Sequence, residues 1–215
     1  MTETFFTESR IELVKNLRQK GIKSEAVLEA FLKVHRHKFI ESGLEKRAYE
    51  DVALPIGNKQ TISQPYTVAF MSQELNVGKN AKVLEIGTGS GFQAAILYTM
   101  GIQVFSIERH QELLDKSRKI LEENGFRVAV RCGDGTLGWS QFAPYDGIIC
   151  TAGSPSVPQS LLKQLKVGAR LIIPVGDEHN QVMQIITRTG EDTYSKSEAD
   201  GFKFVPLIGK EGWKK

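Results

Sequence analysis

Apolar residues form a series of short runs through the middle of the chain, separated by stretches in which apolar positions recur with helical spacing. Short runs bounded by turn formers predict buried strands, and the spaced positions predict amphipathic helices. Strands are expected over 82–86, 103–107, 127–132, 146–150 and 169–174, with helices over 91–99, 110–123 and 158–165. Strands that alternate with helices are typical of a doubly wound α/β fold, in which a mostly parallel sheet carries helices on both faces.

The pattern changes after the last of these strands. Residues 182–187 alternate between two faces, residues 190–192 contain turn formers, and residues 202–207 are mostly apolar. Such alternation predicts antiparallel strands joined by tight turns. We therefore expect an antiparallel edge at the C-terminal side of the sheet.

A helical prefix over residues 1–50 is expected to precede the sheet. Its first helix covers 8–20 and stops at Gly21, a residue that commonly ends helices. Three apolar residues share one face of this helix, namely Ile11, Val14 and Leu17. Prefix and sheet together are expected to form a single domain that spans residues 1–215.

A second helix is expected after Ser24, whose hydroxyl suits a helix N-cap. Its inward-facing residues are expected to be Ala26, Val27, Ala30, Phe31 and Val34. The basic residues 35–38 then end the helix, where positive charge suits the helix dipole. His35 and His37 are accordingly interpreted as end caps and not as ligands.

Residues 55–65 are expected to form an ordered loop before a further helix over 66–75. Pro65 disfavours a helical conformation at Gln64 but suits the first turn of the helix that follows. The polar side chains of Thr61, Ser63 and Gln64 therefore stand just before a helix N-terminus. Such side chains either cap the helix or contact a ligand, and the sequence pattern alone favours capping.

Composition excludes several classes of protein. The chain of 215 residues is 40% apolar and 25% charged, as expected for a soluble globular protein. A formal net charge of +3 gives no case for a nucleic-acid partner. The N-terminus lacks the features of a signal peptide, and no apolar run approaches the length of a membrane span. We therefore expect a cytoplasmic protein with no membrane contact.

The two cysteines, Cys132 and Cys150, lie in or beside expected strands. They are interpreted as two reduced thiols in the core of a cytoplasmic protein. The sequence has no spacing typical of metal ligands, so no metal site is expected.

The most informative stretch of the sequence is the turn between the strand 82–86 and the helix that follows it. Gly87, Gly89 and Gly91 form a Gly-x-Gly-x-Gly turn. Glycines allow positive φ angles and let the backbone approach a ligand closely. Ligands of open α/β sheets bind at the carboxyl ends of the strands, so these glycines are candidate ligand-binding residues.

Three acidic residues stand at or near the ends of successive strands. Glu85 precedes the glycines and suits a ligand that carries an ammonium or sulfonium charge. Glu108 ends the next strand, where an acidic side chain binds ribose hydroxyls, although it could also be a helix N-terminal charge. Asp134, next to Gly135, could accept from an adenine amino group or simply stabilise a turn. The three together indicate S-adenosyl-L-methionine as the cofactor.

Methyl transfer from a sulfonium is an in-line displacement, in which the protein mainly supplies proximity and alignment. A carboxylate is already ionised at pH 7 and needs no general base. After the strand 146–150 the chain continues with small neutral residues, and no Asn-Pro-Pro-Tyr-type segment is present. This segment shapes a cleft and does not deprotonate a substrate.

Several segments together resemble the protein-L-isoaspartate O-methyltransferase family. They are Gln60-Thr61-Ile62-Ser63-Gln64-Pro65, the glycine turn with its flanks over 83–95, Gly133-Asp134-Gly135, and the segments 143–149, 165–176 and 204–209. The similarity runs from about residue 10 to the C-terminus. Residues 60–65 are its specific part, because many methyltransferases share the glycine turn.

The resemblance implies methylation of the α-carboxylate of L-isoaspartyl residues in damaged proteins and peptides, which begins their repair through a succinimide. It implies a Rossmann-like methyltransferase sheet and a catalytic Ser63 that also binds substrate. Thr61, Gln64 and Gly135 are then expected to bind the cofactor, and Ile62, Val205 and Leu207 the substrate. We expect the enzyme to act as a monomer.

Two departures from the family pattern are visible. Gly153 stands where alanine is expected, which should loosen a wall of the site, and Thr136 replaces an aromatic residue, which should weaken packing beside adenine. Three alternatives remain open at this stage. They are a methyltransferase that acts on a small molecule or RNA, a cofactor-binding protein without activity, and a nicotinamide enzyme. Residues 60–65 argue against the first alternative. The intact Ser63, Glu108 and Asp134 argue against the second. The glycine spacing and Glu85 argue against the third.

Overall fold

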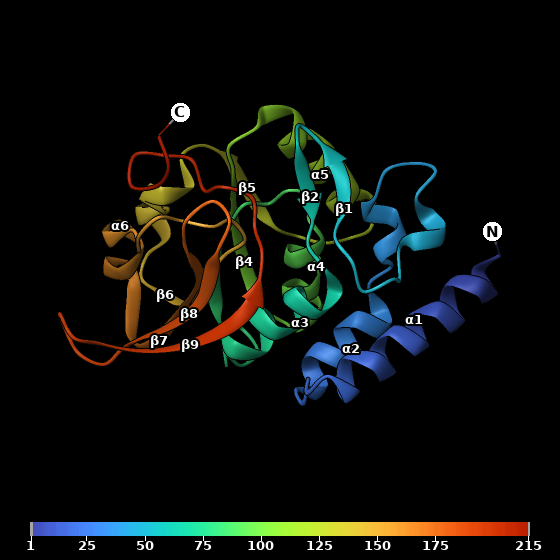
Figure 1. The fold of residues 1–215 in the computed structure, drawn as a ribbon, viewed down its shortest axis with the longest axis horizontal. Coiled ribbons are helices and arrows are strands. Elements are labelled where there is room, and N and C mark those ends of the chain that lie inside the picture. Colours follow the sequence, from blue (N-terminus) through green and yellow to red (C-terminus); the bar gives the residue numbers. More distant parts are fainter. Residues whose placement is uncertain (1, 215) are drawn as a thin grey trace.

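The computed structural model describes residues 2–214. Its main sheet has seven strands in the order β5-β4-β3-β6-β7-β8-β9 (Figure 1). The bounds are β3 Lys82–Ile86, β4 Gln103–Glu108, β5 Ala129–Cys132, β6 Tyr145–Cys150, β7 Leu165–Gly176, β8 Gln181–Arg188 and β9 Tyr194–Phe202. The strands β5, β4, β3, β6 and β7 run parallel to one another. The pairs β7-β8 and β8-β9 are antiparallel. The expected fold class is confirmed.

The antiparallel edge differs in detail from the expectation. The last strand, β9, occupies Tyr194–Phe202 and pairs with β8, so residues 203–207 lie outside it. These residues instead approach the end of β6, where Pro206 forms a bridge with Gly153. The expected strand over 202–207 was wrong, because the backbone of residues 203–207 makes only an isolated bridge to Gly153, while Phe204 and Leu207 pack into the core.

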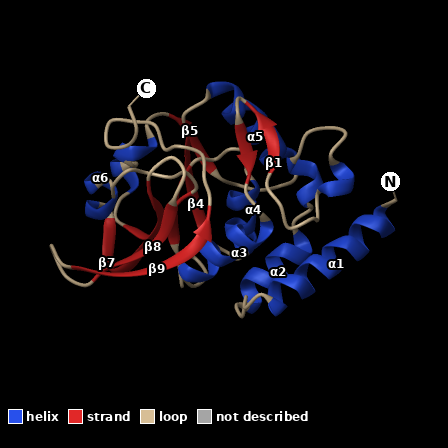
Figure 2. Ribbon diagram, in the orientation of Figure 1, coloured by secondary structure: helices blue, strands red, loops and turns tan. Residues whose placement is uncertain are grey.

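The sheet separates two hydrophobic layers because successive side chains of a strand point to opposite faces (Figure 2). Val83 packs into the layer that contains helices α3 (Pro65–Glu74), α4 (Phe92–Thr99) and α5 (Gln111–Glu123). Leu84 and Ile86 pack into the opposite layer, which contains the short helix α6 (Gln159–Lys163). The central strands are thus buried on both faces, as their apolar runs predict.

The N-terminal prefix contains helices α1 (Glu3–Gln19) and α2 (Glu25–Lys33), followed by two short 3₁₀ helices, η1 (Arg36–Phe39) and η2 (Glu45–Arg47). Ser24 caps α2 by accepting from the Val27 N–H, as expected. Ile11 and Ala26 are exposed, contrary to expectation, because the buried face of each helix is rotated by about one position. The buried faces of the two helices contribute these residues to the core: Phe6, Leu13, Val14, Leu17, Val27, Leu28, Ala30 and Phe31.

His37 does not end a helix as a simple cap. Its ring stacks on Phe6 with 3.9 Å between centroids, and its Nδ1 lies 2.8 Å from the Tyr49 hydroxyl. Burial lowers the pKa of His37, and the nearby His35 lowers it further. These contacts join the first helix to the segment that leads into the sheet.

The segment 55–65 is a hairpin and not a loop. Strands β1 (Leu54–Gly57) and β2 (Gln60–Ile62) pair antiparallel, and the turn between them has positive φ angles at Asn58 and Lys59. The sequence pattern did not reveal this turn, because the strands on either side of it are very short. The hairpin leads directly into α3, which has Pro65 in its first turn.

Cys132 is exposed and Cys150 is buried, so only one of the two expected core thiols lies in the core. Burial raises the pKa of the Cys150 thiol to about 12. Within residues 2–214, no helix combines the length and apolar character that crossing a membrane requires. The same residues contain no cluster of three or more His, Cys, Asp or Glu side chains that could hold a metal ion.

Candidate active site

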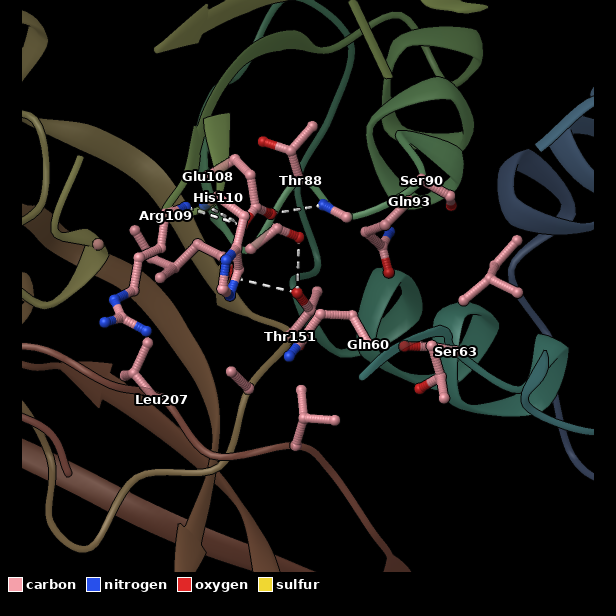
Figure 3. A pocket seen from close by; sticks show the side chains of 18 of the residues that line it. Gln60, Ser63, Thr88, Ser90, Gln93, Glu108, Arg109, His110, Thr151 and Leu207 are labelled. Carbon is pink, nitrogen blue, oxygen red and sulfur yellow. Dashed lines mark hydrogen bonds between the residues drawn. The ribbon is translucent and has the colours of Figure 1, made fainter. Parts of the chain in front are cut away.

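A cavity opens at the carboxyl ends of β3, β4 and β6, where the doubly wound fold places its ligands (Figure 3). It encloses about 860 Å³, part of which is open to solvent. It is lined by the segment 60–63, the turns after β3, β4, β5 and β6, the first turn of α4, Val68 of α3, and the segment 205–208. Nine of the expected site residues line it, namely Thr61, Ile62, Ser63, Gly87, Gly89, Glu108, Gly135, Val205 and Leu207.

The glycine turn brings the backbone to the cavity. Gly87 has φ 97° and Gly89 has φ 52°, values that non-glycine residues rarely adopt. A Cβ on Gly87 would stand 2.5 Å from the Thr151 Oγ1 atom. Gly91 has a different role from the one expected, since it does not line the cavity and is the N-cap of α4. Its lack of a side chain leaves room for Leu121, which would lie 3.1 Å from a Cβ there.

Glu108 lies at the edge of the cavity, as expected. Its Oε2 accepts from the Gly89 N–H at 2.8 Å, and its Oε1 accepts from the N–H groups of Arg109 and His110. These bonds fix the carboxylate, which is only 6% exposed. A carboxylate has about four acceptor positions, and three are used, so Oε2 can still accept from a hydroxyl group of a ligand.

Glu85 does not reach the cavity. Its side chain is completely buried, and its Oε2 accepts from the Ser106 hydroxyl at 2.5 Å. The Ser106 hydroxyl also lies 2.6 Å from the Thr88 hydroxyl, and Thr88 lines the cavity. Burial raises the pKa of Glu85 to about 8, which favours its protonated form. Its buried position does not fit the expectation that it presents a negative charge to the ligand, and the side chain supports the glycine turn from below.

Asp134 is also turned away from the cavity, whereas its neighbour Gly135 lines it. The Asp134 carboxylate accepts from the Thr136 N–H and hydroxyl and from the Lys210 N–H at 2.7 Å. Burial raises its pKa, but these donors lower it more, so the net pKa lies below its ordinary value. Asp134 instead borders an adjoining depression together with Arg109. Its expected contact with adenine stays a prediction.

Residues 60–63 reach the cavity because the β1-β2 hairpin lies beside the glycine turn (Figure 1). None of the expected capping bonds forms. The N-cap of α3 is Gln64, which makes no side-chain cap and does not line the cavity. Its expected cofactor contact stays a prediction. The Tyr66 N–H is instead capped at 2.8 Å by Asp51, a residue of the preceding loop. The side chain of Ser63 is thus left to face the cavity.

The segment 205–208 closes the opposite wall. Gly153 pairs with it on one side, since the Gly153 N–H donates to the Val205 carbonyl and the Leu207 N–H donates to the Gly153 carbonyl. The Leu207 carbonyl is also occupied, because it accepts from the Trp213 N–H.

A model of the protein-L-isoaspartate(D-aspartate) O-methyltransferase (PCMT) family matches residues 8–212 of the chain. The chain belongs to this family. A protein-L-isoaspartate O-methyltransferase of Cytophaga hutchinsonii is 50% identical over 204 residues, which is 95% of this chain and 92% of that protein.

Two solved structures are similar to this PCMT-family chain. A protein-L-isoaspartate O-methyltransferase has a TM-score of 0.86 at 28% identity, over 94% of this chain and 67% of that chain. A second structure, from Plasmodium falciparum, is in complex with S-adenosyl-L-homocysteine. It has a TM-score of 0.79 at 22% identity, over 92% of this chain and 97% of that chain, and it shows the shared fold.

The two departures from the PCMT pattern have structural explanations. A Cβ on Gly153 would stand 2.7 Å from the Gln181 side chain, so the glycine makes room for Gln181 and does not loosen the wall. Thr136 is completely buried and does not line the cavity. Its hydroxyl accepts from the Glu211 N–H, so it fixes the C-terminal segment.

Sequence reasoning missed several polar residues of the cavity. Thr151 donates to the Ile86 and Gly87 carbonyls. It is the hydroxyl residue in the small neutral segment after β6, and that position could have indicated it. Arg109 and His110 directly follow Glu108, a position that could have suggested them. No sequence pattern indicated Gln93 in the first turn of α4, because only the packing of the helix brings its amide to the cavity.

Proposed function

We propose that Glu108 and the glycine turn hold the methyl donor in this cavity and that Ser63 orients the carboxylate that receives the methyl group. Membership of the PCMT family identifies the reaction. The chain is an S-adenosyl-L-methionine-dependent protein-L-isoaspartate O-methyltransferase, and its substrates are proteins that contain isoaspartyl residues. The observation that carries the proposal is that Ser63 and the glycine turn, which lie far apart in sequence, line one cavity.

The residues present fit the donor. Glu108 offers a fixed carboxylate for a hydroxyl group at one side of the cavity. A Cβ on Gly87 would collide with Thr151, and a Cβ on Gly135 would collide with Ile86, so the backbone that lines the cavity at these two positions requires glycine. When bound, S-adenosyl-L-methionine supplies a methyl group on a sulfonium, which is an activated leaving group.

The protein supplies alignment in this reaction. The substrate carboxylate is ionised at pH 7, so no side chain needs to remove a proton. Ser63 is half-buried and can donate its hydroxyl to one carboxylate oxygen, which leaves the other oxygen free to attack. Ile62 and the segment 205–207 would hold the substrate backbone on either side of it. Alignment of this kind contributes several kcal/mol to the lowering of a barrier.

Ser63→Ala tests this assignment. We expect kcat for an isoaspartyl peptide to fall about tenfold or more, since one aligning bond is lost. The Kd for S-adenosyl-L-homocysteine, measured by calorimetry, should stay within about twofold. Ser195→Ala, at an exposed serine of β9, is the matched control and should change neither quantity. An unchanged kcat for Ser63→Ala would remove Ser63 from the mechanism.

We further propose that the chain acts as one domain and as a monomer in the cytoplasm. The helices of the prefix and those of the sheet share one hydrophobic cluster, which supports a single domain. Two free cysteines, one of them exposed, suit a reducing compartment. Sedimentation equilibrium should give a mass near 24.0 kDa, and twice that mass would contradict the monomer.

A further inference from the structure

The side chain of Gln93 lies at the wall of the cavity on a side different from Glu108 (Figure 3). Gln93 stands in the first turn of α4, directly after the glycine turn, and is 6% exposed. In Figure 3 it lies with Ser90 and Ser63 on one side of the cavity, while Glu108 and Arg109 lie on the other. A ligand held by Glu108 would therefore extend toward Gln93.

The amide of Gln93 is fixed at one end by a buried chain of hydrogen bonds. Its Nε2 donates to the Ser72 hydroxyl at 2.8 Å, and that hydroxyl donates to the Val68 carbonyl at 2.7 Å. Ser72 is 1% exposed and belongs to α3, the helix that follows Ser63. Two helices thus hold the amide in place, so its position does not depend on a ligand.

The other end of the amide lacks a partner. The Gln93 Oε1 atom is buried and accepts no hydrogen bond within the described part of the protein. A buried polar atom without a partner is costly and unusual in a folded protein. Because Gln93 lines the cavity, the missing partner can come from a ligand in it.

The ligand chemistry that fits is an amino-acid zwitterion. An amide pairs with an ammonium through its oxygen and with a carboxylate through its NH₂ group. Because the Ser72 hydroxyl donates its one proton to the Val68 carbonyl, it accepts from the amide NH₂ group and leaves Oε1 as the end that a ligand ammonium can reach. Gln93 also stands at the N-terminus of α4, where the helix dipole favours negative charge such as a carboxylate. The adenosine part of a donor carries no charge, and its ribose is placed at Glu108 on the other side of the cavity (Figure 3).

We propose that Gln93 binds the amino-acid end of the methyl donor and so distinguishes S-adenosyl-L-methionine from nucleosides that lack this end. The inference rests on the proposed placement of the donor, with its ribose at Glu108. Gln93 is a binding residue in this account, and Ser72 is the residue that positions it.

Calorimetric titration of two ligands tests the proposal. S-adenosyl-L-homocysteine carries the amino-acid end, and 5′-methylthioadenosine lacks it. For Gln93→Leu we expect the affinity for S-adenosyl-L-homocysteine to fall about tenfold, which corresponds to about 1.4 kcal/mol. The affinity for 5′-methylthioadenosine should remain within about twofold, because the adenosine contacts are untouched.

Ser72→Ala provides a second, milder variant, in case Gln93→Leu disturbs the fold. It should weaken S-adenosyl-L-homocysteine several-fold and leave 5′-methylthioadenosine unchanged, because only the position of the amide is affected. Gln103→Leu, at an exposed residue of β4, is the matched control and should change neither affinity.

Equal losses for both ligands would overturn the proposal, because Gln93 would then act only through the fold. Unchanged affinity for both ligands would also overturn it, because the ligand would then not supply the partner of the Gln93 Oε1 atom. Failure of the wild-type protein to bind either ligand would instead contradict the placement of the donor in this cavity.

Discussion

Replacement of Glu85 by glutamine should change how the stability of the protein depends on pH. Glu85 is completely buried, its Oε1 has no hydrogen-bond partner among the described residues, and only Ser106 donates to its Oε2. Burial raises its pKa from 4.5 to about 8, with the charge of Glu108 adding to the increase. Glutamine has a similar shape and carries no charge at any pH.

The sign of the effect follows from the protons bound. The unfolded chain releases the Glu85 proton near pH 4.5, whereas the folded protein keeps it to about pH 8. The stabilisation from this proton is therefore fully present below pH 4.5 and is lost as the pH rises to 8. The interval is roughly 3.5 pH units, which at 1.36 kcal/mol per unit gives a total on the order of 5 kcal/mol.

Urea unfolding of both proteins at pH 6, 7, 8 and 9 measures this difference. The free energy of unfolding of Glu85→Gln, relative to wild type, should rise by about 1.4 kcal/mol per pH unit up to pH 8 and then level off. Binding of S-adenosyl-L-homocysteine should change little, since Glu85 does not line the cavity. Parallel pH profiles for the two proteins would refute the reasoning, as would a large loss of binding at constant stability.

Two further substitutions test other parts of the site. Gly87→Ala should lower the stability by about 1–3 kcal/mol and weaken donor binding at least about tenfold, because φ is 97° and the Cβ would meet Thr151; calorimetry that shows normal binding would contradict this. Asp134→Ala should release the segment held at Lys210 and Thr136, so limited trypsin digestion should cut after Lys210 faster than in wild type. Loss of donor affinity at an unchanged cleavage rate would show that Asp134 contacts the ligand instead.

Most of the fold could be predicted from the sequence because the elements of the sheet have clear periodicities. Apolar runs and helical spacing gave the central strands and helices within a few residues. The β1-β2 hairpin was missed because strands of four and three residues are too short to show a period. Ile11 was wrongly expected on the buried face of its helix. The apolar residues of that helix do not by themselves determine which face is buried.

The candidate site could be predicted at positions where a residue with suitable chemistry stands at the end of a strand. Gly87 and Glu108 stand at strand ends, and a position at a strand end alone places them near a ligand. Glu85 failed because it lies within a strand buried on both faces, so its side chain enters the protein interior. The bond between Asp134 and the distant Lys210 N–H was not predicted, because no local pattern reveals such a contact.

Methyl transfer to a pair of synthetic peptides tests the central claim most directly. The two peptides have the same sequence and differ only in one L-isoaspartyl or L-aspartyl residue, and the methyl group of S-adenosyl-L-methionine is radiolabelled. We predict that label enters the isoaspartyl peptide alone and is released by mild base, as expected for a carboxyl methyl ester. Absence of label from both peptides, with the donor bound in the cavity, would contradict the account.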